Sequence, residues 1–537
     1  MLHAHRRAAR GPALRACLLP LATLAALTGC DPWSRLDPQG EADLDEALWS
    51  DQLVAAGDRV YVRLPHAGAL LELAPDGAVR QVDLDGAAPE QVIPLPDGEA
   101  AFVFARWPIC ADDDEDIVLV DECPEDALEE GSELRLVSGH RTSGTYALAP
   151  HFNTLQFSPD GQTAVAFLDP AQGGYPEVSG VADLTEVVFL PLGGGAPLAV
   201  STGSSPKQVL FTTDDEGRND RAVILSTSQV VVVDVATAEV LVTYPLALDV
   251  DTVIVPEQAL VAGGGRYCLL AVDGGRELYR LDLVNESIDI EDLEGTPALL
   301  AELQLGEGSG EVATLVGYDD IAALDVLDGL TNERVQRFSL DHPVNRSLQE
   351  GQTLIAWSSQ SDIYKDVYII NLDTAEVDEQ RAGNPLRSLQ LSDDGRFAVG
   401  EMGPDNYGDG SAQDNLHGLF VLELGEGQPT NLALSSAPVG MALSTRGEQS
   451  FVLLLLDGDD QLYKVDLSRP SFAVPVELPA PPSSLVRLDD GRVAIAHASP
   501  LGLVSFYDPA NDEVSSIAGF ATTQMLVEPT LPRRADN

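Results

Sequence analysis

The chain has 537 residues, 86 acidic and 31 basic, which gives a formal net charge of −55 at pH 7. Binding to nucleic-acid phosphates needs clustered Lys and Arg, whereas the only lysines are Lys207, Lys365 and Lys464, so the composition excludes a nucleic-acid-binding protein. Hydrophobic residues make up 44% of the chain, so the acidity does not indicate disorder.

Residues 1–29 have the pattern of a secretory signal. The apolar segment 16–27 is too short to span a bilayer and follows a basic flank made by Arg6, Arg7, Arg10 and Arg15. The segment ends in Leu27-Thr28-Gly29-Cys30, which resembles the lipobox of bacterial lipoproteins. The resemblance implies cleavage before Cys30 and acylation of that cysteine, and more than one acyl chain gives stable anchoring. The alternatives are an ordinary secretory signal with a chance cysteine, or an uncleaved hydrophobic N-terminus.

Three further segments follow the signal. Residues 30–47 are polar and acidic, carry two prolines and indicate a short tether. Residues 48–520 repeat one β-rich theme, and residues 521–537 form a C-terminal tail. We therefore expect one repeat-built domain, exported and lipid-anchored to a membrane of the bacterial cell envelope.

The first repeated signature in 48–520 is a hairpin. Its fullest copy is LQFSPDGQTAVAFLD at 155–169, and weaker copies lie at 92–105, 389–402, 441–456 and 486–499. Asp-Gly supplies the positive φ that such turns require, and the flanking Val, Ala, Phe and Leu favour paired strands.

The second signature is an apolar strand that ends in an Asp-containing turn and returns as an outer strand. It occurs at 230–244, 278–290, 367–379 and 462–474. Two hairpins per unit predict a four-stranded antiparallel sheet, and helical periodicity is nearly absent outside the signal.

The repeat units number ten and begin near residues 49, 88, 151, 206, 250, 297, 343, 385, 438 and 481, about 48 residues apart. This period, with four strands per unit, predicts an all-β fold, a β-propeller of four-stranded antiparallel blades. Seven or eight blades are the commonest number, ten is the count of units, and two smaller propellers side by side are the alternative. A parallel β-helix is disfavoured because its repeats are much shorter.

The motifs also resemble a known group of propellers. Phe157-Ser158-Pro159-Asp160-Gly161 followed by 164–167 resembles the WD40-like repeat of TolB-type periplasmic propellers, and the Leu-Tyr-x-x-Asp strands resemble YVTN and lactonase-like propellers. No Trp-Asp pair closes a unit, so intracellular WD40 repeats match poorly. The resemblance implies a protein- or ligand-binding scaffold of the cell envelope, with loops on one face of the ring as the binding surface.

The cysteines differ by location. Cys17 lies in the signal, and Cys110 and Cys123 bracket an acidic segment, so that an exported compartment allows a disulfide between them. Cys268, inside an apolar run, is expected to be a small core residue.

Two acidic segments are candidate calcium sites, because calcium prefers several oxygen ligands. One contains Asp112, Asp114 and Asp116; the other contains Asp405 and Asp409. The second matches an EF-hand loop only in part, since Tyr407 stands at the third position and Leu416 at the place of the bidentate Glu. The alternative for both is a solvated loop, with the acidity serving solubility; no other cofactor is indicated.

Enzyme templates find little support. The chain has no Gly-x-Ser-x-Gly and no His-Glu-x-x-His motif. The histidines beyond the signal are scattered over the units and are each expected to be core or surface residues: His66, His140, His151, His342, His417 and His497. The alternative to a scaffold is a lactonase-like or quinoprotein-like enzyme, which would collect charged side chains from several blades at the central channel. A scaffold would lack such a group of side chains at its channel and would have a shaped loop surface.

Overall fold

The computed structural model describes residues 52–85, 87–96, 98, 100–110, 128–148, 152–169, 184–213, 219–246, 256–272, 274–305, 311–359, 363–405, 416–425 and 427–521. The described residues lie within one compact unit, 47–537.

The described residues form ten four-stranded antiparallel sheets, here called blades 1 to 10, each made of four strands consecutive in the chain. Blades 1 to 5 consist of β1 (Leu53–Ala56), β2 (Arg59–Leu64), β3 (Ala69–Leu73), β4 (Val79–Gln81); β5 (Ala88–Pro94), β6 (Ala101–Cys110), β7 (Leu128–Ser138), β8 (Arg141–Leu148); β9 (Thr154–Phe157), β10 (Thr163–Phe167), β11 (Glu186–Pro191), β12 (Leu198–Ser201); β13 (Pro206–Thr213), β14 (Asn219–Ser226), β15 (Gln229–Asp234), β16 (Val240–Pro245); and β17 (Pro256–Ala262), β18 (Tyr267–Val272), β19 (Glu277–Asp282), β20 (Ser287–Asp292).

Blades 6 to 10 consist of β21 (Pro297–Leu305), β22 (Glu311–Tyr318), β23 (Ala323–Asp328), β24 (Arg334–Ser339); β25 (Arg346–Glu350), β26 (Thr353–Trp357), β27 (Asp366–Asn371), β28 (Val377–Arg381); β29 (Leu386–Leu391), β30 (Phe397–Met402), β31 (His417–Glu423), β32 (Thr430–Leu434); β33 (Pro438–Arg446), β34 (Gln449–Leu456), β35 (Leu462–Asp466), β36 (Val474–Val476); and β37 (Pro482–Arg487), β38 (Val493–His497), β39 (Leu503–Asp508), β40 (Glu513–Ala518). A 3₁₀ helix, η1 (Pro65–Ala67), precedes β3.

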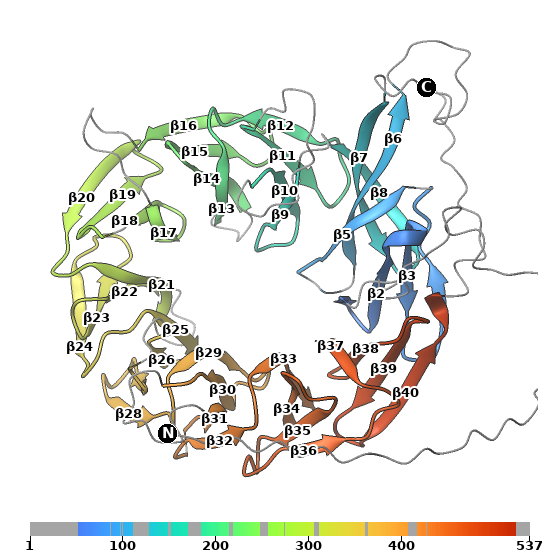
Figure 1. Ribbon diagram of the computed structural model, residues 1–537. Coiled ribbons are helices and arrows are strands. Elements are labelled where there is room, and N and C mark those ends of the chain that lie inside the picture. Colours follow the sequence, from blue (N-terminus) through green and yellow to red (C-terminus); the bar gives the residue numbers. More distant parts are fainter. Residues whose placement is uncertain are drawn as a thin grey trace, which may run out of the picture. The chain divides into compact units, whose positions relative to one another are not determined.

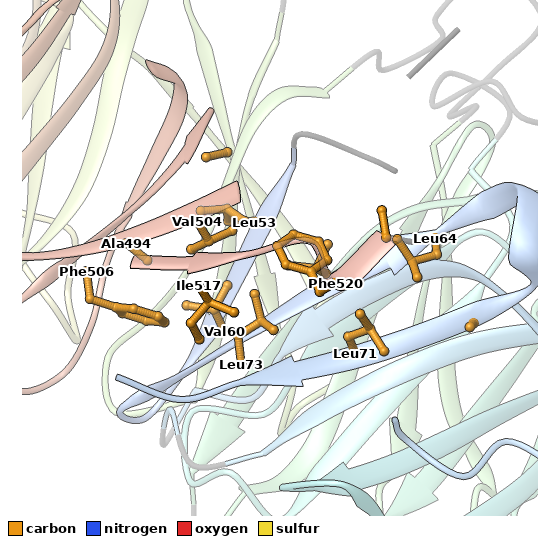
Figure 2. Close-up of a cluster of buried hydrophobic side chains, with 14 of the residues drawn as sticks. Leu53, Val60, Leu64, Leu71, Leu73, Ala494, Val504, Phe506, Ile517 and Phe520 are labelled. Carbon is orange, nitrogen blue, oxygen red and sulfur yellow. The ribbon is translucent and has the colours of Figure 1, made fainter. Parts of the chain in front are cut away.

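The blades follow one another around a central opening, with the first strand of each blade innermost and the fourth at the periphery (Figure 1). Ten clusters of buried apolar side chains fill the ten interfaces between successive blades. The cluster between blades 10 and 1 joins Leu53 and Leu71 to Phe506 and Ile517 (Figure 2). The ring is therefore closed by packing of sheet on sheet, because each blade is made of its own four strands.

The observed blades match the sequence units. The first strands begin within six residues of the ten predicted starts, so the fold class and the count of ten are confirmed. The ten interfaces form one closed cycle, so the alternative of two smaller propellers is wrong.

The predicted Asp-Gly hairpins link the first two strands of several blades and also connect neighbouring blades. In blade 3, Gly161 has φ 65°, and the Asp160 carboxylate accepts hydrogen bonds from Ser158 Oγ (2.6 Å) and Gln162 N (3.0 Å). Its second oxygen accepts from the backbone N–H of Asn219 in blade 4 at 3.0 Å. Burial raises the pKa of Asp160, but these hydrogen bonds outweigh it and hold that pKa below its usual range.

The second signature forms the turn between the third and fourth strands. In blade 5, Asp282 accepts from the backbone N–H of Asn285 at 2.9 Å, and Glu286 has φ 57°. Asp234 and Thr237 form the same bond at 2.8 Å in blade 4, where Ala238 has φ 55°. The side-chain cap stabilises a left-handed residue other than glycine.

Three glutamines join the innermost strands, which would otherwise expose unpaired backbone edges. Gln258 Nε2 donates to Ala298 O at 2.7 Å, and Gln258 Oε1 accepts from Leu300 N at 2.7 Å. Gln349 of β25 accepts from Gln304 N and donates to Gln304 O of β21, which joins blade 7 to blade 6. Gln156 of β9 accepts from Val209 N of β13, which joins blade 3 to blade 4.

Candidate functional site

The two ends of the blades differ in the length of their connections. We call the end where the first strands begin the top face; it carries the second-to-third and fourth-to-first connections. The longest connections in the chain all belong to it: 111–127, 168–185, 246–255, 358–365 and 403–416. The bottom face carries short turns, of which 467–473 is the longest. Because binding residues concentrate in loops held by a rigid scaffold, the top face is the candidate site.

Asparagines fix the ends of three of these connections. Asn153 accepts from Asp169 N at 2.8 Å and donates to Asp169 O at 2.9 Å. Asn345 accepts from Ser359 N at 2.8 Å, and Asn384 donates to Leu416 O at 2.7 Å. Each asparagine directly precedes the first strand of its blade or lies one residue further upstream. These hydrogen bonds hold one end of the second-to-third connection in each of blades 3, 7 and 8 against the start of the blade's first strand.

Two connections of the top face are linked by an ion pair. Lys365 Nζ, before β27, lies 2.7 Å from Asp405 Oδ2, after β30, and the two side chains are 16% and 7% exposed. Asp405, a predicted calcium ligand, thus has a cation beside it. The other predicted ligands, Asp112, Asp114, Asp116 and Asp409, lie outside the described residues.

A histidine lies at the top of blade 7. His342 Nδ1 is 2.5 Å from Asp366 Oδ2, and the histidine ring is tilted against Tyr364 with 4.6 Å between centroids. The Asp366 side chain is 7% exposed and the His342 side chain 42%. The arrangement orients an exposed imidazole with a buried carboxylate.

Blade 10 holds a second histidine in its core. His497 and Ser505 are both fully buried. Nδ1 of His497 donates to Ala480 O at 2.7 Å, and Nε2 lies 2.7 Å from Ser505 Oγ, which lies 2.8 Å from Ser516 Oγ. Burial lowers the pKa of His497. The pair is shaped like a base and nucleophile, but its burial gives it a structural role.

The innermost strands carry charge at the top face. In seven of them one extra residue bulges near the start: Glu90, Lys207, Glu257, Ala298, Arg387, Val439 and Ser483. Sequence reasoning missed these positions, although a proline one residue before the bulge in six of them was a usable signal. Four of the seven bulge residues are charged: Glu90, Lys207, Glu257 and Arg387.

The structure describes two of the cysteines beyond the signal, Cys110 and Cys268. Cys268 is fully buried in β18, and burial raises the pKa of its thiol to about 12, as expected of a core residue. The main chain of Cys110 ends β6 opposite Leu128. Cys30 and Cys123 lie outside the described residues.

Among the described residues, no group of three or more His, Cys, Asp or Glu could hold a metal ion. In that part of the chain no helix is long and apolar enough to cross a membrane. A hollow of about 380 Å³ between β8 and 192–195 is lined by uncharged residues, among them Tyr146 and Gly194.

No protein-family model matches the sequence, and no curated protein matches it. Solved structures are similar in fold. Dihydro-heme d1 dehydrogenase NirN in complex with DHE has 9% identity over 73% of this chain and 74% of that one, with a TM-score of 0.39. BamB from Moraxella catarrhalis has 11% identity over 80% and 96%, TM-score 0.35. The Neurospora crassa Pan2 WD40 domain has 12% identity over 55% and 86%, TM-score 0.31. The chain is a β-propeller of four-stranded antiparallel blades.

Proposed function

We propose that this chain is a lipid-anchored β-propeller of the bacterial cell envelope that binds a protein or ligand through its top face. The observation that carries the binding role is the gathering of all the longest connections at one end of the blades, three of them fixed by asparagines. The location rests on the lipobox-like sequence that ends at Cys30.

Site-specific photo-crosslinking in intact cells tests the binding role. Exposed aliphatic residues occur at both ends: Ile363 (54%), Leu416 (38%) and Leu501 (47%) at the top, Val284 (60%) and Leu330 (58%) at the bottom. A photoreactive residue at each top position should form adducts of defined mass, whereas the matched bottom positions should not. Adducts from the bottom alone, or from neither end, contradict the proposal.

Metabolic labelling with a fatty acid tests the anchor. The wild-type protein should take up label, Cys30→Ser should not, and Cys17→Ser should label normally because Cys17 lies within the signal. Label on the Cys30→Ser protein would show that the anchor is elsewhere.

A further inference from the structure

We propose that the hollow between blades 2 and 3 binds a small uncharged saccharide. This inference goes beyond the proposed function, because the hollow includes the third-to-fourth turn of blade 3 and so lies at the bottom end of the blades. It depends neither on the connections of the top face nor on the lipid anchor.

The hollow has the size of a small-molecule site. Its volume is about 380 Å³, and such sites have roughly 300–1,000 Å³. One wall consists of residues 143–146 of β8 with Leu136 of β7, and the other of residues 192–195, the turn between β11 and β12. Since β8 is the outermost strand of blade 2, the hollow lies at the periphery of the ring and not in the central opening (Figure 1).

Blades 4 and 5 have the same backbone arrangement at this place. Tyr146, in the fourth strand of blade 2, donates from its hydroxyl to Pro191 O at 3.0 Å. Tyr244, in the fourth strand of blade 4, donates to Asp282 O at 2.7 Å. Both acceptors end the third strand of the next blade. The two tyrosines are therefore equivalent, and the positions around them can be compared one by one.

The two places differ two positions before the tyrosine. Val242, which pairs with Val232, packs into the apolar cluster between blades 4 and 5. Gly144, which pairs with Leu136 after the same one-residue bulge, has no side chain there. Residues 193–195 are three further glycines, whereas 284–286 of blade 5 all carry side chains. The space between blades 2 and 3 is therefore left by missing side chains on both of its walls.

The lining of the hollow selects against charged ligands. Every residue that lines it is uncharged, although the whole chain has a net charge of −55. A charged ligand would lose hydration there without meeting an opposite charge. The hollow is therefore suited to a neutral ligand.

The polar and apolar groups of the lining match a sugar ring. Ser143 and Thr145 are exposed, and a hydroxyl both donates and accepts hydrogen bonds. The backbone of β8 adds groups without a strand partner, because β8 is the edge of its sheet. Leu136, Tyr146 and Leu192 provide apolar surface. A saccharide presents hydroxyls around apolar C–H faces and can use both kinds of contact.

The experiment measures binding of five probes to the full chain by isothermal titration calorimetry and saturation-transfer-difference NMR. Glucose, maltose and N-acetylglucosamine are neutral; glucosamine and glucuronate are their charged counterparts. We expect saturable binding of at least one neutral sugar and weaker binding of both charged ones. The absence of saturable binding by all three neutral sugars, or equal or tighter binding of a charged one, overturns the proposal.

Gly144→Val gives blade 2 the side chain that blade 4 has at this place and should abolish measurable binding. The backbone tolerates the change, because a Cβ at Gly144 would come no closer than 3.6 Å to Tyr146 and 3.7 Å to Leu136. A melting curve checks that the variant is folded.

Thr145→Val removes one hydroxyl at an exposed position and should weaken binding about three- to tenfold. It decides the question if Gly144→Val does not fold. The matched control is Thr243→Val, which makes the same change directly before the equivalent tyrosine of blade 4 and should leave the affinity unchanged. Binding that folded Gly144→Val leaves intact, or that Thr243→Val weakens as much as Thr145→Val does, contradicts the assignment to this hollow.

Discussion

The ammonium group of Lys365 lies 2.7 Å from a carboxylate oxygen of Asp405, across the interface of blades 7 and 8. Both side chains are largely buried, so Lys365→Met would leave a carboxylate without its cation in a poorly solvated place. We expect it to lower the unfolding free energy by about 3 kcal/mol. Thermal and urea unfolding measure the loss.

A surface pair provides the control for this experiment. Arg396 and Glu423 lie 3.1 Å apart in blade 8, with side chains 48% and 43% exposed. Arg396→Met should cost less than about 1 kcal/mol, since exposed ion pairs contribute little. Equal losses for the two variants would mean that burial does not strengthen the Lys365 pair.

Calcium should change the stability little if the acidity is a diffuse property of the surface. In that case sodium chloride stabilises the protein by screening the net charge of −55. A specific site would add about 2.7 kcal/mol at a hundred times its dissociation constant. Melting curves in chelator, sub-millimolar calcium and matched sodium chloride distinguish the two. A saturable calcium shift that alanine removes at Asp112, Asp114 and Asp116, or at Asp405 and Asp409, would establish a metal site.

Gln258 should stabilise the contact between β17 and β21, the innermost strands of blades 5 and 6. Gln258→Leu removes two hydrogen bonds of 2.7 Å and leaves Ala298 O and Leu300 N at an exposed strand edge. We expect a loss of about 1–3 kcal/mol. Gln390→Leu, on the exposed side of β29, is the control and should have almost no effect. Unchanged melting of the Gln258→Leu protein would show that these two hydrogen bonds do not stabilise the contact between β17 and β21.

His497 should make the protein less stable in mild acid. Burial places the pKa of the folded-state ring below that of the unfolded chain, about 6.5. The contribution of His497 is therefore complete above about pH 6.5 and falls as the pH drops through the window between the two pKa values. Melting temperatures from pH 8 to 5 should show this slope in the wild type and in His140→Gln, but less of it in His497→Gln. A slope that persists in His497→Gln assigns it to other groups.

The cysteines should differ in reactivity. The buried thiol of Cys268, with its pKa raised to about 12, should resist alkylation in the native protein and react after unfolding. Cys110 and Cys123 should appear as one disulfide-linked peptide on non-reducing mapping. Recovery of both as separately alkylated peptides from oxidised protein would show that no such bond forms.

Turn chemistry made much of the fold predictable. The Asp-Gly hairpin at Asp160 and Gly161 and the Asp-capped turn at Asp282 depend on side-chain bonds over two to three residues. Such turns form as the sequence indicates, whatever packs around them. Their spacing therefore marked ten units, although seven or eight blades are commoner.

The relationships at the candidate site were not predictable in this way. Asp405 resembled a calcium ligand within its own segment, and Lys365 is 40 positions earlier in the chain. Arg346 and Trp357 carry no motif; they stand opposite each other because β25 pairs with β26.

The sequence by itself determined the all-β class, the hairpin turns, the number of repeat units and the buried character of Cys268. Only the tertiary structure decided how the ring closes, through Leu53 and Phe506 at opposite ends of the repeats, and which charges at the top face pair. The reason is the range of the forces involved. Turn propensities act between neighbouring residues, whereas packing of sheet on sheet depends on the geometry accumulated over all ten blades.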